Sequence, residues 1–485
     1  MQYEVINTDS YRQIMEKYQV GSLLAKIVSS FCYTEDDLVP FFMPKTYGTY
    51  YHESFSAIEE VLKEAKINNR KVFVFGDYDC DGICATTLLV KVLSKLGIQN
   101  GYYIPNRFTE GYGLNIDRVM QAYEKGYEIL ITVDNGVSAH EALKYAKSVG
   151  MTVIVTDHHV IGEEVECDIL CHPSLFEEDY QYLCGSGVVY VLADYLGLAD
   201  EEMTELAMIA TIGDVMELKG FNIQLVNEGL AVLNNHGSKS IDILSNNLRY
   251  PCDETDVGFR IVPKINSIGR LADMANANQA VRFLLAEDVT EIMALAEQIN
   301  RLNDLRKEMT NQQYQKVSES CDKDEDFIIV VDESLHEGIV GILAGKLCDS
   351  LNKPCIVFTE SGGLLKGSGR SIPSVDIFEV VSGFKDNCVA LGGHPQACGI
   401  SIEKDKLADF KQYLKDNYQA VDYVPVKKCI EVTNEDLTRE NIDEVFSYGP
   451  YGQGRQMPIL RLNQGPIIKL NAHAYNGYYI DRFAN

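Results

Sequence analysis

The sequence predicts an α/β protein in which a parallel sheet carries the chemistry. Three apolar segments have the length of buried strands: Lys71–Phe75, Ile129–Val133 and Met151–Thr156. Stretches with helical spacing separate them, and short strands alternating with helices are typical of a parallel sheet. Each strand stops abruptly at carboxylates or imidazoles. Because the carboxyl ends of parallel strands meet at one edge, we expect these side chains to lie together.

The first strand leads into Phe-Gly-Asp-Tyr-Asp-Cys-Asp-Gly at residues 75–82. Its three alternate carboxylates, Asp77, Asp79 and Asp81, repel one another unless a cation lies among them. Taken alone, the triplet fits a solvated acidic turn as well as it fits a divalent-metal site. A helix is expected to follow, from Ile83 to Leu96.

The later strand ends favour the metal site. The second strand runs into Asp134-Asn135-Gly136 and the third into Asp157-His158-His159, and Asp214 follows a helical stretch. Carboxylates and imidazoles without paired cysteines suit Mn²⁺ or Mg²⁺ better than structural zinc. The sequence therefore predicts two divalent ions at one sheet edge, the usual arrangement for hydrolysis of phosphoesters.

Four segments are expected along the chain. The metal-binding α/β domain, with helices leading in, takes residues 1–235, and a helical connector takes 236–318, with one long helix or a helix pair from Val281 to about Ser318. A second, smaller α/β domain begins near Phe327–Val331 and fills 319–420. Residues 421–485 form a C-terminal segment.

Composition indicates a cytoplasmic globular protein. Hydrophobic residues make up 46% of the chain and charged residues 24%, which is ordinary for globular proteins. No apolar run approaches the ~18–20 residues needed to span a membrane, and the start lacks the features of a secretory signal. Thirteen cysteines without a framework favour reduced thiols.

Charge raises a difficulty for nucleic-acid binding, since the formal net charge is −28. Local potential matters more than the whole-chain sum, so a basic groove in an acidic body would still attract phosphates. We expect such a groove from a cluster of basic residues: Arg260, Lys264, Arg270, Arg282, Arg301, Arg306 and Lys307. A solvated helix face is the alternative for the residues from Arg301 to Lys307.

The acidic and histidine segments together resemble the four motifs of the DHH phosphoesterase superfamily. Within it the chain most resembles the RecJ exonucleases, which degrade single-stranded DNA from the 5′ end. Further matching segments support that branch: Ile104–Arg107 with Glu110–Leu114, Leu183–Gly187, Pro263–Asn266 with Gly269-Arg270, His336–Gly341 and Gly392–His394.

The resemblance assigns roles to individual residues. Asp79 and Asp81 each face one ion, and Asp134 bridges the two. His158 and Asp214 complete the second ion's shell. Asp77 is the extra carboxylate on the first ion, His159 contacts the scissile phosphate, and Asp157 orients an imidazole. Substrate contacts are implied for Arg107, Asn266, Arg270, Arg370, Ser371, Gly392, Gly393 and His394.

The C-terminal segment fits the resemblance only in part. Tyr448–Gly454 resembles the start of an oligonucleotide-binding barrel, but the chain given ends at Asn485. Residues 473–485 cannot complete a five-stranded barrel alone, so we expect an incomplete barrel or a repurposed region. Tyr475, Tyr478 and Tyr479 either stack bases or lie at an exposed sheet end.

The resemblance implies an exonuclease that uses two Mn²⁺ ions, or Mg²⁺, to release mononucleotides from single-stranded DNA in repair and recombination. The resemblance implies a single-stranded-DNA-binding protein and a RecQ-type helicase as partners. It implies no association with a membrane. Two alternatives stay open: a phosphodiesterase for short oligonucleotides or cyclic dinucleotides, and a non-catalytic scaffold of replication or repair.

Overall fold

The computed structural model describes residues 2–32, 34–111, 113–245, 248, 251–471 and 479–482. The chain divides into two compact units. The larger unit holds Glu4–Asn300 and Lys428–Asn485, and the smaller unit consists chiefly of Arg301–Lys427. The division falls within the 32-residue helix α15 (Val289–Ser320), which follows α14 (Asn278–Leu285). The expected helix pair is therefore present, and the four expected domain boundaries stay predictions.

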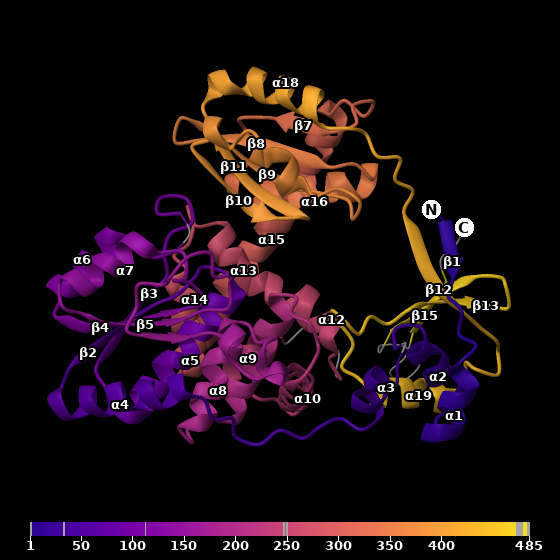
Figure 1. Cartoon of the computed structure of the whole chain (residues 1–485), viewed down its shortest axis with the longest axis horizontal. Coiled ribbons are helices and arrows are strands. Elements are labelled where there is room, and N and C mark those ends of the chain that lie inside the picture. The colour runs from indigo at the N-terminus through magenta and orange to yellow at the C-terminus, as the bar shows by residue number, and fades with distance from the viewer. Residues whose placement is uncertain are drawn as a thin grey trace. The chain divides into compact units, whose positions relative to one another are not determined.

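A five-stranded parallel sheet forms the centre of the larger unit (Figure 1). The order of its strands is β3-β2-β4-β5-β6, and every neighbouring pair is parallel. The apolar side chains that predicted three of these strands are buried along them. Their bounds are β2 Lys71–Phe75, β3 Asn100–Tyr103, β4 Tyr127–Val133, β5 Thr152–Thr156 and β6 Ile169–Cys171.

Helices cover both faces of this sheet, which explains why its strands are apolar throughout. In Figure 1, α6 (Ile116–Glu124) and α7 (His140–Ser148) lie on one face, with α4 and α5 on the other. The helices α5, α8 and α9 pack on one another, and most of their residues are buried. The remaining helices of this layer are α4 Glu53–Asn68, α5 Cys80–Leu96, α8 Gly185–Tyr195, α9 Glu201–Gly213, α10 Phe221–Asn234, α11 Lys239–Leu244, α12 Glu254–Asp256 and α13 Val262–Arg270.

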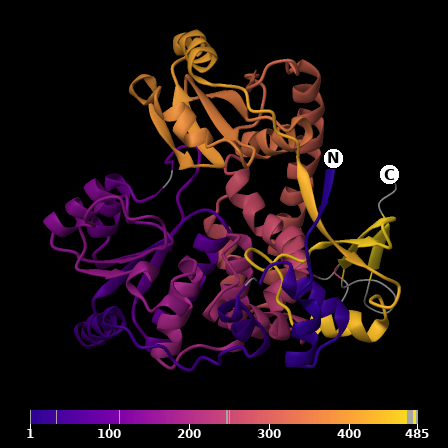
Figure 2. The same ribbon diagram turned by 45° about the vertical axis from the view of Figure 1, so that its right-hand side comes forward.

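The two ends of the chain share a second sheet and a separate hydrophobic core. Strand β1 (Gln2–Val5) joins β12, β13, β14 and β15 in the order β1-β12-β13-β14-β15. The first helices lie beside these strands in Figure 2. Leu23, Leu24 and Ile27 share one buried cluster with Ile430 and Leu460. The elements are α1 Tyr11–Tyr18, α2 Ser22–Ser29, α3 Glu35–Phe42, β12 Val426–Val432, α19 Arg439–Ser447, β13 Ile459–Leu462, β14 Ile467–Asn471 and β15 Tyr479–Arg482.

The purely helical lead-in expected for the N-terminus is therefore wrong at β1. The Ile6 amide donates to the Cys429 carbonyl at 2.8 Å, which ties the N-terminal strand to β12. Its four side chains are exposed, so no buried alternation marked it as a strand. The C-terminal sheet has five strands, but a closed barrel is not seen in the described residues. Tyr475 and Tyr478 lie outside the described residues.

The smaller unit is a mixed sheet with helices on it, as the second α/β unit was expected to be. Its order is β10-β11-β9-β8-β7; β7 and β8 are parallel and the other pairs antiparallel. Separate apolar clusters cover its two faces. Its elements are β7 Ile328–Val331, α16 Val340–Leu351, β8 Cys355–Ser361, β9 Leu364–Arg370, α17 Ile377–Ser382, β10 Ala390–His394, β11 Ala397–Ile402 and α18 Leu407–Asn417.

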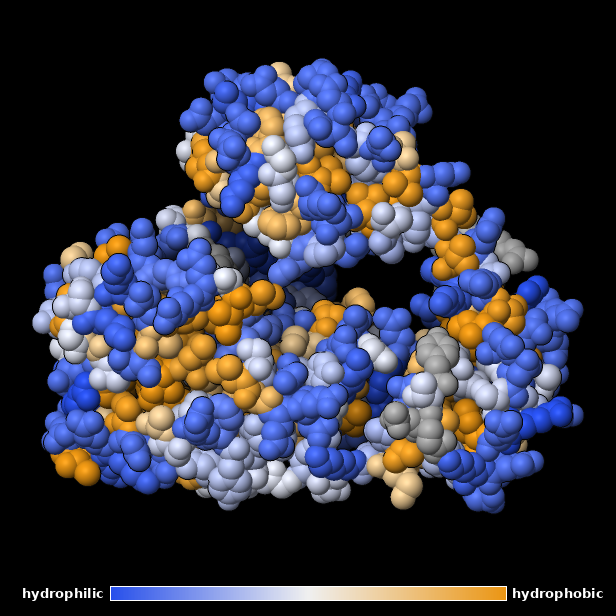
Figure 3. Space-filling view, in the orientation of Figure 1, coloured by the Kyte–Doolittle hydropathy of each residue, from blue (hydrophilic) through white to orange (hydrophobic). Residues whose placement is uncertain are grey.

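The visible surface is mostly hydrophilic. Hydrophilic residues cover most of the face seen in Figure 3, with apolar residues in scattered groups. In the part of the chain that the structure describes, no helix combines the length and apolar character that crossing a membrane requires. All thirteen cysteines are free thiols.

Candidate metal centre

The predicted site residues meet at the carboxyl edge of the parallel sheet. Strand β2 lies between β3 and β4, so the chain winds in opposite directions on its two sides. Ligands of open α/β sheets bind in the crevice outside the strand ends at such a switch point. Asp77 follows β2, Asp134 directly follows β4, and Asp157 directly follows β5. The topology therefore places these residues where sequence reasoning expected them.

The loop from Gly76 to Asp81, here the metal loop, turns sharply from β2 into α5. Asp79 caps α5, because its side chain accepts a hydrogen bond from the Gly82 amide at 3.0 Å. A Cβ on Gly82 would lie only 2.5 Å from the Asp77 carbonyl oxygen. Only glycine fits there, so the Asp-Gly pair belongs to the turn that brings the carboxylates together.

Two groups of three ligand atoms lie close enough to hold ions. Asp77, Asp79 and Asp134 offer oxygens within 4.8 Å of one another, and so do the ligand atoms of Asp81, His158 and Asp214. A third grouping joins Asp134 to His158 and His159. Since Asp134 belongs to the first group and contacts the histidine of the second, it lies between the two.

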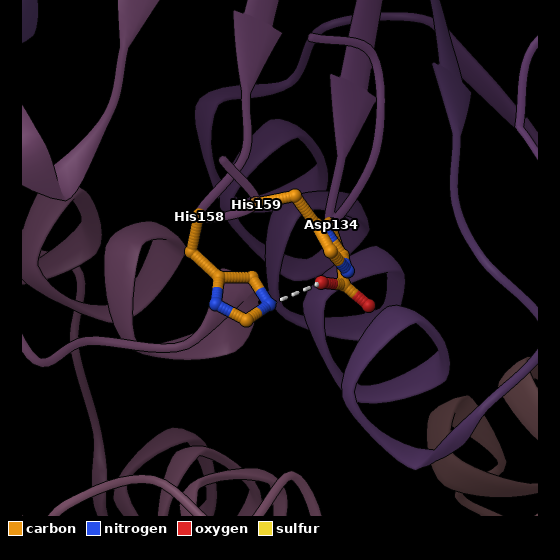
Figure 4. A group of neighbouring side chains, drawn as sticks. All are labelled: Asp134, His158 and His159. Atoms are coloured by element: carbon orange, nitrogen blue, oxygen red, sulfur yellow. Dashed lines mark ion pairs between the residues drawn. The ribbon is translucent and has the colours of Figure 1, made fainter. Parts of the chain in front are cut away.

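His158 faces carboxylates from three different elements. Its Nε2 lies 3.2 Å from Asp134 Oδ1, 3.5 Å from Asp214 Oδ2 and 3.8 Å from Asp81 Oδ2. In Figure 4 its ring extends toward the Asp134 carboxylate, with His159 beside it. Burial lowers the pKa of His158 more than the Asp81 charge raises it. A neutral imidazole among carboxylates has the form in which histidine binds metal.

Electrostatics shows that this cluster is built around positive charge. Asp77, Asp81 and Asp134 are no more than 4% exposed. Burial and neighbouring carboxylates raise the pKa of Asp77 and of Asp134 well above the usual range, and that of Asp214 to about 8. Such crowding is costly without cations.

Two oxygens without hydrogen bonds also favour bound cations. Within the described residues, Asp77 Oδ1 and Asp134 Oδ1 are buried and accept no hydrogen bond of good geometry. Asp134 also adopts a left-handed backbone with φ of 58°, a strained conformation that clusters at functional sites. Five carboxylates and one imidazole fit two divalent ions of the Mn²⁺ or Mg²⁺ kind.

The beginning of helix α8 holds Asp81 in place. The Gly185 and Ser186 amides each donate to one Asp81 oxygen at 2.7 Å, and the Ser186 hydroxyl donates to its backbone carbonyl at 2.9 Å. A Cβ on Gly185 would lie 2.6 Å from Asp134 Cβ, so glycine lets the helix approach both aspartates. Helix N-termini favour carboxylates in this way.

Asp157 positions the second histidine of the Asp-His-His segment. Its Oδ1 lies 2.8 Å from His159 Nδ1 and accepts the backbone amides of both histidines. Its other oxygen accepts the Val137 amide at 3.0 Å. Burial alone would lower the pKa of His159, but the Asp157 bond and nearby carboxylates raise it to about 9. The expected orienting role of Asp157 thus falls on His159.

A buried histidine contacts the backbone of the same segment. His172 Nε2 lies 2.8 Å from the His159 carbonyl oxygen, and its Nδ1 lies 2.8 Å from the Ser174 hydroxyl. Sequence reasoning gave His172 no role. The signal was weak, because one histidine after a short strand has no motif of its own.

The three substrate residues expected in the larger unit all adjoin the metal loop. Asn266 Oδ1 accepts the Cys80 amide at 2.8 Å, and the Arg107 guanidinium lies 5.1 Å from the centre of the Tyr78 ring. Arg270 follows Gly269, whose added Cβ would lie 2.3 Å from the Tyr78 carbonyl. Asn266 therefore braces the loop, while Arg107 and Arg270 bring positive charge to it.

Three members of the expected basic cluster are buried or paired with carboxylates. Lys264 is buried, and its ammonium donates to the Leu244 carbonyl at 2.6 Å, so its place in an exposed basic cluster was wrong. Arg282 pairs with Glu291 at 2.6 Å and Arg260 with Asp256 at 3.4 Å. Periodicity did not reveal this, because burial of a lysine depends on tertiary packing.

The predicted substrate residues of the smaller unit lie at the end of β9 and on β10, the two strands that flank β11. Arg370 ends β9, where its Nη1 donates to the Gly369 carbonyl at 2.7 Å, and the Ser371 hydroxyl donates to the Val375 carbonyl at 2.7 Å. Gly392, Gly393 and His394 are exposed on β10. A Cβ on Gly393 would lie 2.4 Å from the Ala397 carbonyl, whereas none of the described atoms lies within 4 Å of one on Gly392.

Comparison with known proteins agrees with this geometry. Residues 71–213 match the DHH family, N-terminal domain, and residues 324–420 match the DHHA1 domain. The single-stranded-DNA-specific exonuclease RecJ of Thermus thermophilus is 32% identical over 469 residues, which cover 94% of this chain and 68% of that protein. This chain belongs to the RecJ family.

Other RecJ proteins extend the match. RecJ of Bacillus subtilis is 34% identical over 414 residues, 82% of this chain and 52% of that protein. The chain thus spans about half the length of that relative. The crystal structure of Thermus thermophilus RecJ in complex with Mn²⁺ has a TM-score of 0.85 and 25% identity, and the match covers all of this chain and 80% of that one. The predicted fold class and family are confirmed.

Proposed function

We propose that this RecJ-family chain is a metal-dependent exonuclease that degrades single-stranded DNA from the 5′ end to mononucleotides, in repair and recombination. The observation that carries the proposal is the pair of ligand groups that share one edge of the parallel sheet, with Asp134 between them. The substrate follows from the relatives, which are single-stranded-DNA-specific exonucleases.

Asp77, Asp79 and Asp134 would hold one ion, and Asp81, His158 and Asp214 the other, with Asp134 shared. We propose Mn²⁺, since a related RecJ binds it, and Mg²⁺ as a second choice because the ligands are mostly oxygens. When bound, such ions lower the pKa of the attacking water and offset charge developing on the phosphate.

The remaining residues bind and orient the strand. Asp157 fixes Nδ1 of His159, which leaves Nε2 to donate to a phosphate oxygen. The Asp81 carboxylate keeps its orientation through the two α8 amides. Arg107 and Arg270 supply cations for neighbouring phosphates. In the smaller unit Arg370, Ser371, Gly392, Gly393 and His394 are proposed to contact the strand.

Setting and partners are proposed on narrower grounds. Thirteen free thiols suit a reducing compartment such as the cytoplasm. A single-stranded-DNA-binding protein and a RecQ-type helicase are proposed partners, because both supply single strands.

The test is digestion, with Mn²⁺, of a ~40-nucleotide strand labelled at its 3′ end, beside its duplex and a dinucleotide. We expect a ladder that shortens from the 5′ end, with the duplex spared. Asp134→Ala should abolish it, while Asp117→Ala, an exposed change on α6, should not. Cleavage of the dinucleotide alone would assign a short-substrate phosphodiesterase, and silence on both substrates would favour a scaffold.

A further inference from the structure

One phenylalanine stands apart from all the others that the structure describes. Phe259 is 79% exposed, whereas each of the remaining described phenylalanines is buried or half-buried. An exposed phenyl ring gains nothing from folding, because the hydrophobic effect favours its removal from water. Phe259 belongs to none of the motifs assigned to the metal centre or to the substrate contacts.

The backbone that carries Phe259 is also unusual. Residues Val257–Ile261 form a π-helical turn, η3, that continues directly into α13. Isolated π-helical turns are rare in proteins and occur frequently at functional sites. Val257 and Ile261 anchor the turn, since both are buried.

The turn and the start of α13 are packed against the end of α9, which leads into Asp214. A Cβ on Gly258 would lie 3.4 Å from Ile212 Cγ2, and one on Gly213 would lie 3.2 Å from Val262. Gly213 immediately precedes the predicted ligand Asp214. Farther along the same helical segment, Asn266 accepts the Cys80 amide of the metal loop. Seven residues of helix separate Phe259 from Asn266, a rise of roughly 10 Å.

A second exposed apolar side chain marks the same end of α9. Val215 follows Asp214, is 65% exposed, and has a left-handed backbone with φ of 55°. That conformation is an outlier for a β-branched residue, and its neighbour is a predicted metal ligand. Strain and exposure therefore coincide at the rim of the centre.

The chemistry of this place fits a nucleobase. One phenyl ring matches one base, and aromatic rings hold successive bases of single strands by stacking. The next residue, Arg260, is half-exposed, and its guanidinium lies 3.4 Å from the Asp256 carboxylate. A protein partner would need a broader patch of apolar surface, on the order of several hundred Å², than one ring flanked by arginine and glycine provides.

We propose that Phe259 is a stacking platform for a base of the bound single strand, one to a few nucleotides from the scissile phosphate. The proposal rests on the proposed function, because it needs a single strand at the metal centre. It adds a base contact to a site otherwise described through phosphate contacts alone. Such a contact tolerates any sequence, since every base has a π-face.

The test is an abasic scan of the substrate. A set of single strands carries one abasic residue at successive positions from the 5′ end, and release of the first nucleotide is followed in single turnovers. For the wild type, affinity for the strand should fall about tenfold when the abasic residue occupies one particular position. Phe259→Ala should bind the intact strand about tenfold more weakly and lose the abasic penalty at that position only.

Two matched variants separate stacking from general effects. Phe259→Trp should keep both the affinity and the penalty. Ile67→Ala removes an equally exposed side chain, 78% accessible, from the end of α4 just before β2 begins, at the opposite edge of the sheet. It should leave both unchanged. Melting temperatures check that all variants fold.

The outcomes separate this proposal from the one on which it rests. If the wild type does not cleave single strands, the exonuclease proposal fails first. If the wild type cleaves them and Phe259→Ala retains the same positional penalty, the platform is refuted while the exonuclease stands. A wild type without a penalty at any position refutes the platform as well.

Discussion

The metal centre and the Gly-Gly-His strand β10 differ most in their exposure to water. The centre's Asp77, Asp81 and Asp134 are 4%, 1% and 2% exposed, whereas Gly392–His394 are exposed along β10. Charges act strongly where water is excluded, so burial suits the groups that drive the reaction. Groups that hold and release a long strand gain from access instead. Under the proposed function, the groups assigned to the chemistry are buried and the groups assigned to strand binding are exposed.

The largest expected effect comes from replacing one side chain in each region. Asp134→Asn should lower turnover by about a thousandfold or more, because it removes the carboxylate shared by both ligand groups. His394→Ala should lower kcat/KM by about tenfold, because it removes one proposed, solvent-exposed contact with a phosphate. Single-turnover cleavage of a labelled strand measures both. Equal losses in the two variants would show that the burial of a side chain does not predict how much it contributes to cleavage.

Removing metal sharpens the same contrast through stability. The folded-state pKa of Asp214, about 8, lies above its ordinary value. Stability from such a group is present at low pH and is lost as pH rises through the folded pKa. The melting temperature of chelator-treated protein should therefore fall from about pH 4 to about pH 8, between the ordinary and the folded-state pKa of Asp214.

Added Mn²⁺ should remove most of that slope, since bound cations compensate the carboxylates. Asp134→Asn should melt higher than the wild type when both are metal-free, because the amide replaces a buried carboxyl group whose pKa is raised by burial and by neighbouring carboxylates. His394→Ala provides the control, and its pH slope should match that of the wild type. A metal-free wild type whose melting temperature rises with pH over this range would contradict the description of the centre.

The smallest expected effect is a change in folding stability, seen when two adjacent glycines of β10 are each replaced by alanine. Gly393→Ala brings a Cβ to 2.4 Å from the Ala397 carbonyl, and it should destabilise the protein by about 2 kcal/mol. Gly392→Ala adds a methyl group in open space and should change stability by less than about 0.5 kcal/mol.

Denaturant titration measures the two stabilities, and substrate binding gives the complementary result. Gly392→Ala should weaken DNA binding if backbone approaches the strand there, although it is neutral for folding. Similar stabilities for the two variants would mean that β10 and β11 do not pack as closely as described.

Much of the larger unit could be predicted from the sequence, because its signals are local. Strand β2 ends at Phe75 and the carboxylates follow at alternate positions, so order along the chain already places them at one edge. Asp134 and Asp157 follow the same rule on β4 and β5. The exposed β1 could not be predicted, since a strand with no buried face has no periodicity to reveal its partner.

Local sequence patterns were enough to predict the parallel sheet, the carboxylates and histidines at its edge, and the family resemblance that these motifs carry. Four features were visible only in the folded chain: the α8 amides hold Asp81, His172 supports His159, Lys264 is buried and Phe259 is exposed. The physical reason is the range of the interactions. Strand patterns and turns depend on neighbours in the chain, whereas these contacts join residues 13 to 105 positions apart or depend on packing alone.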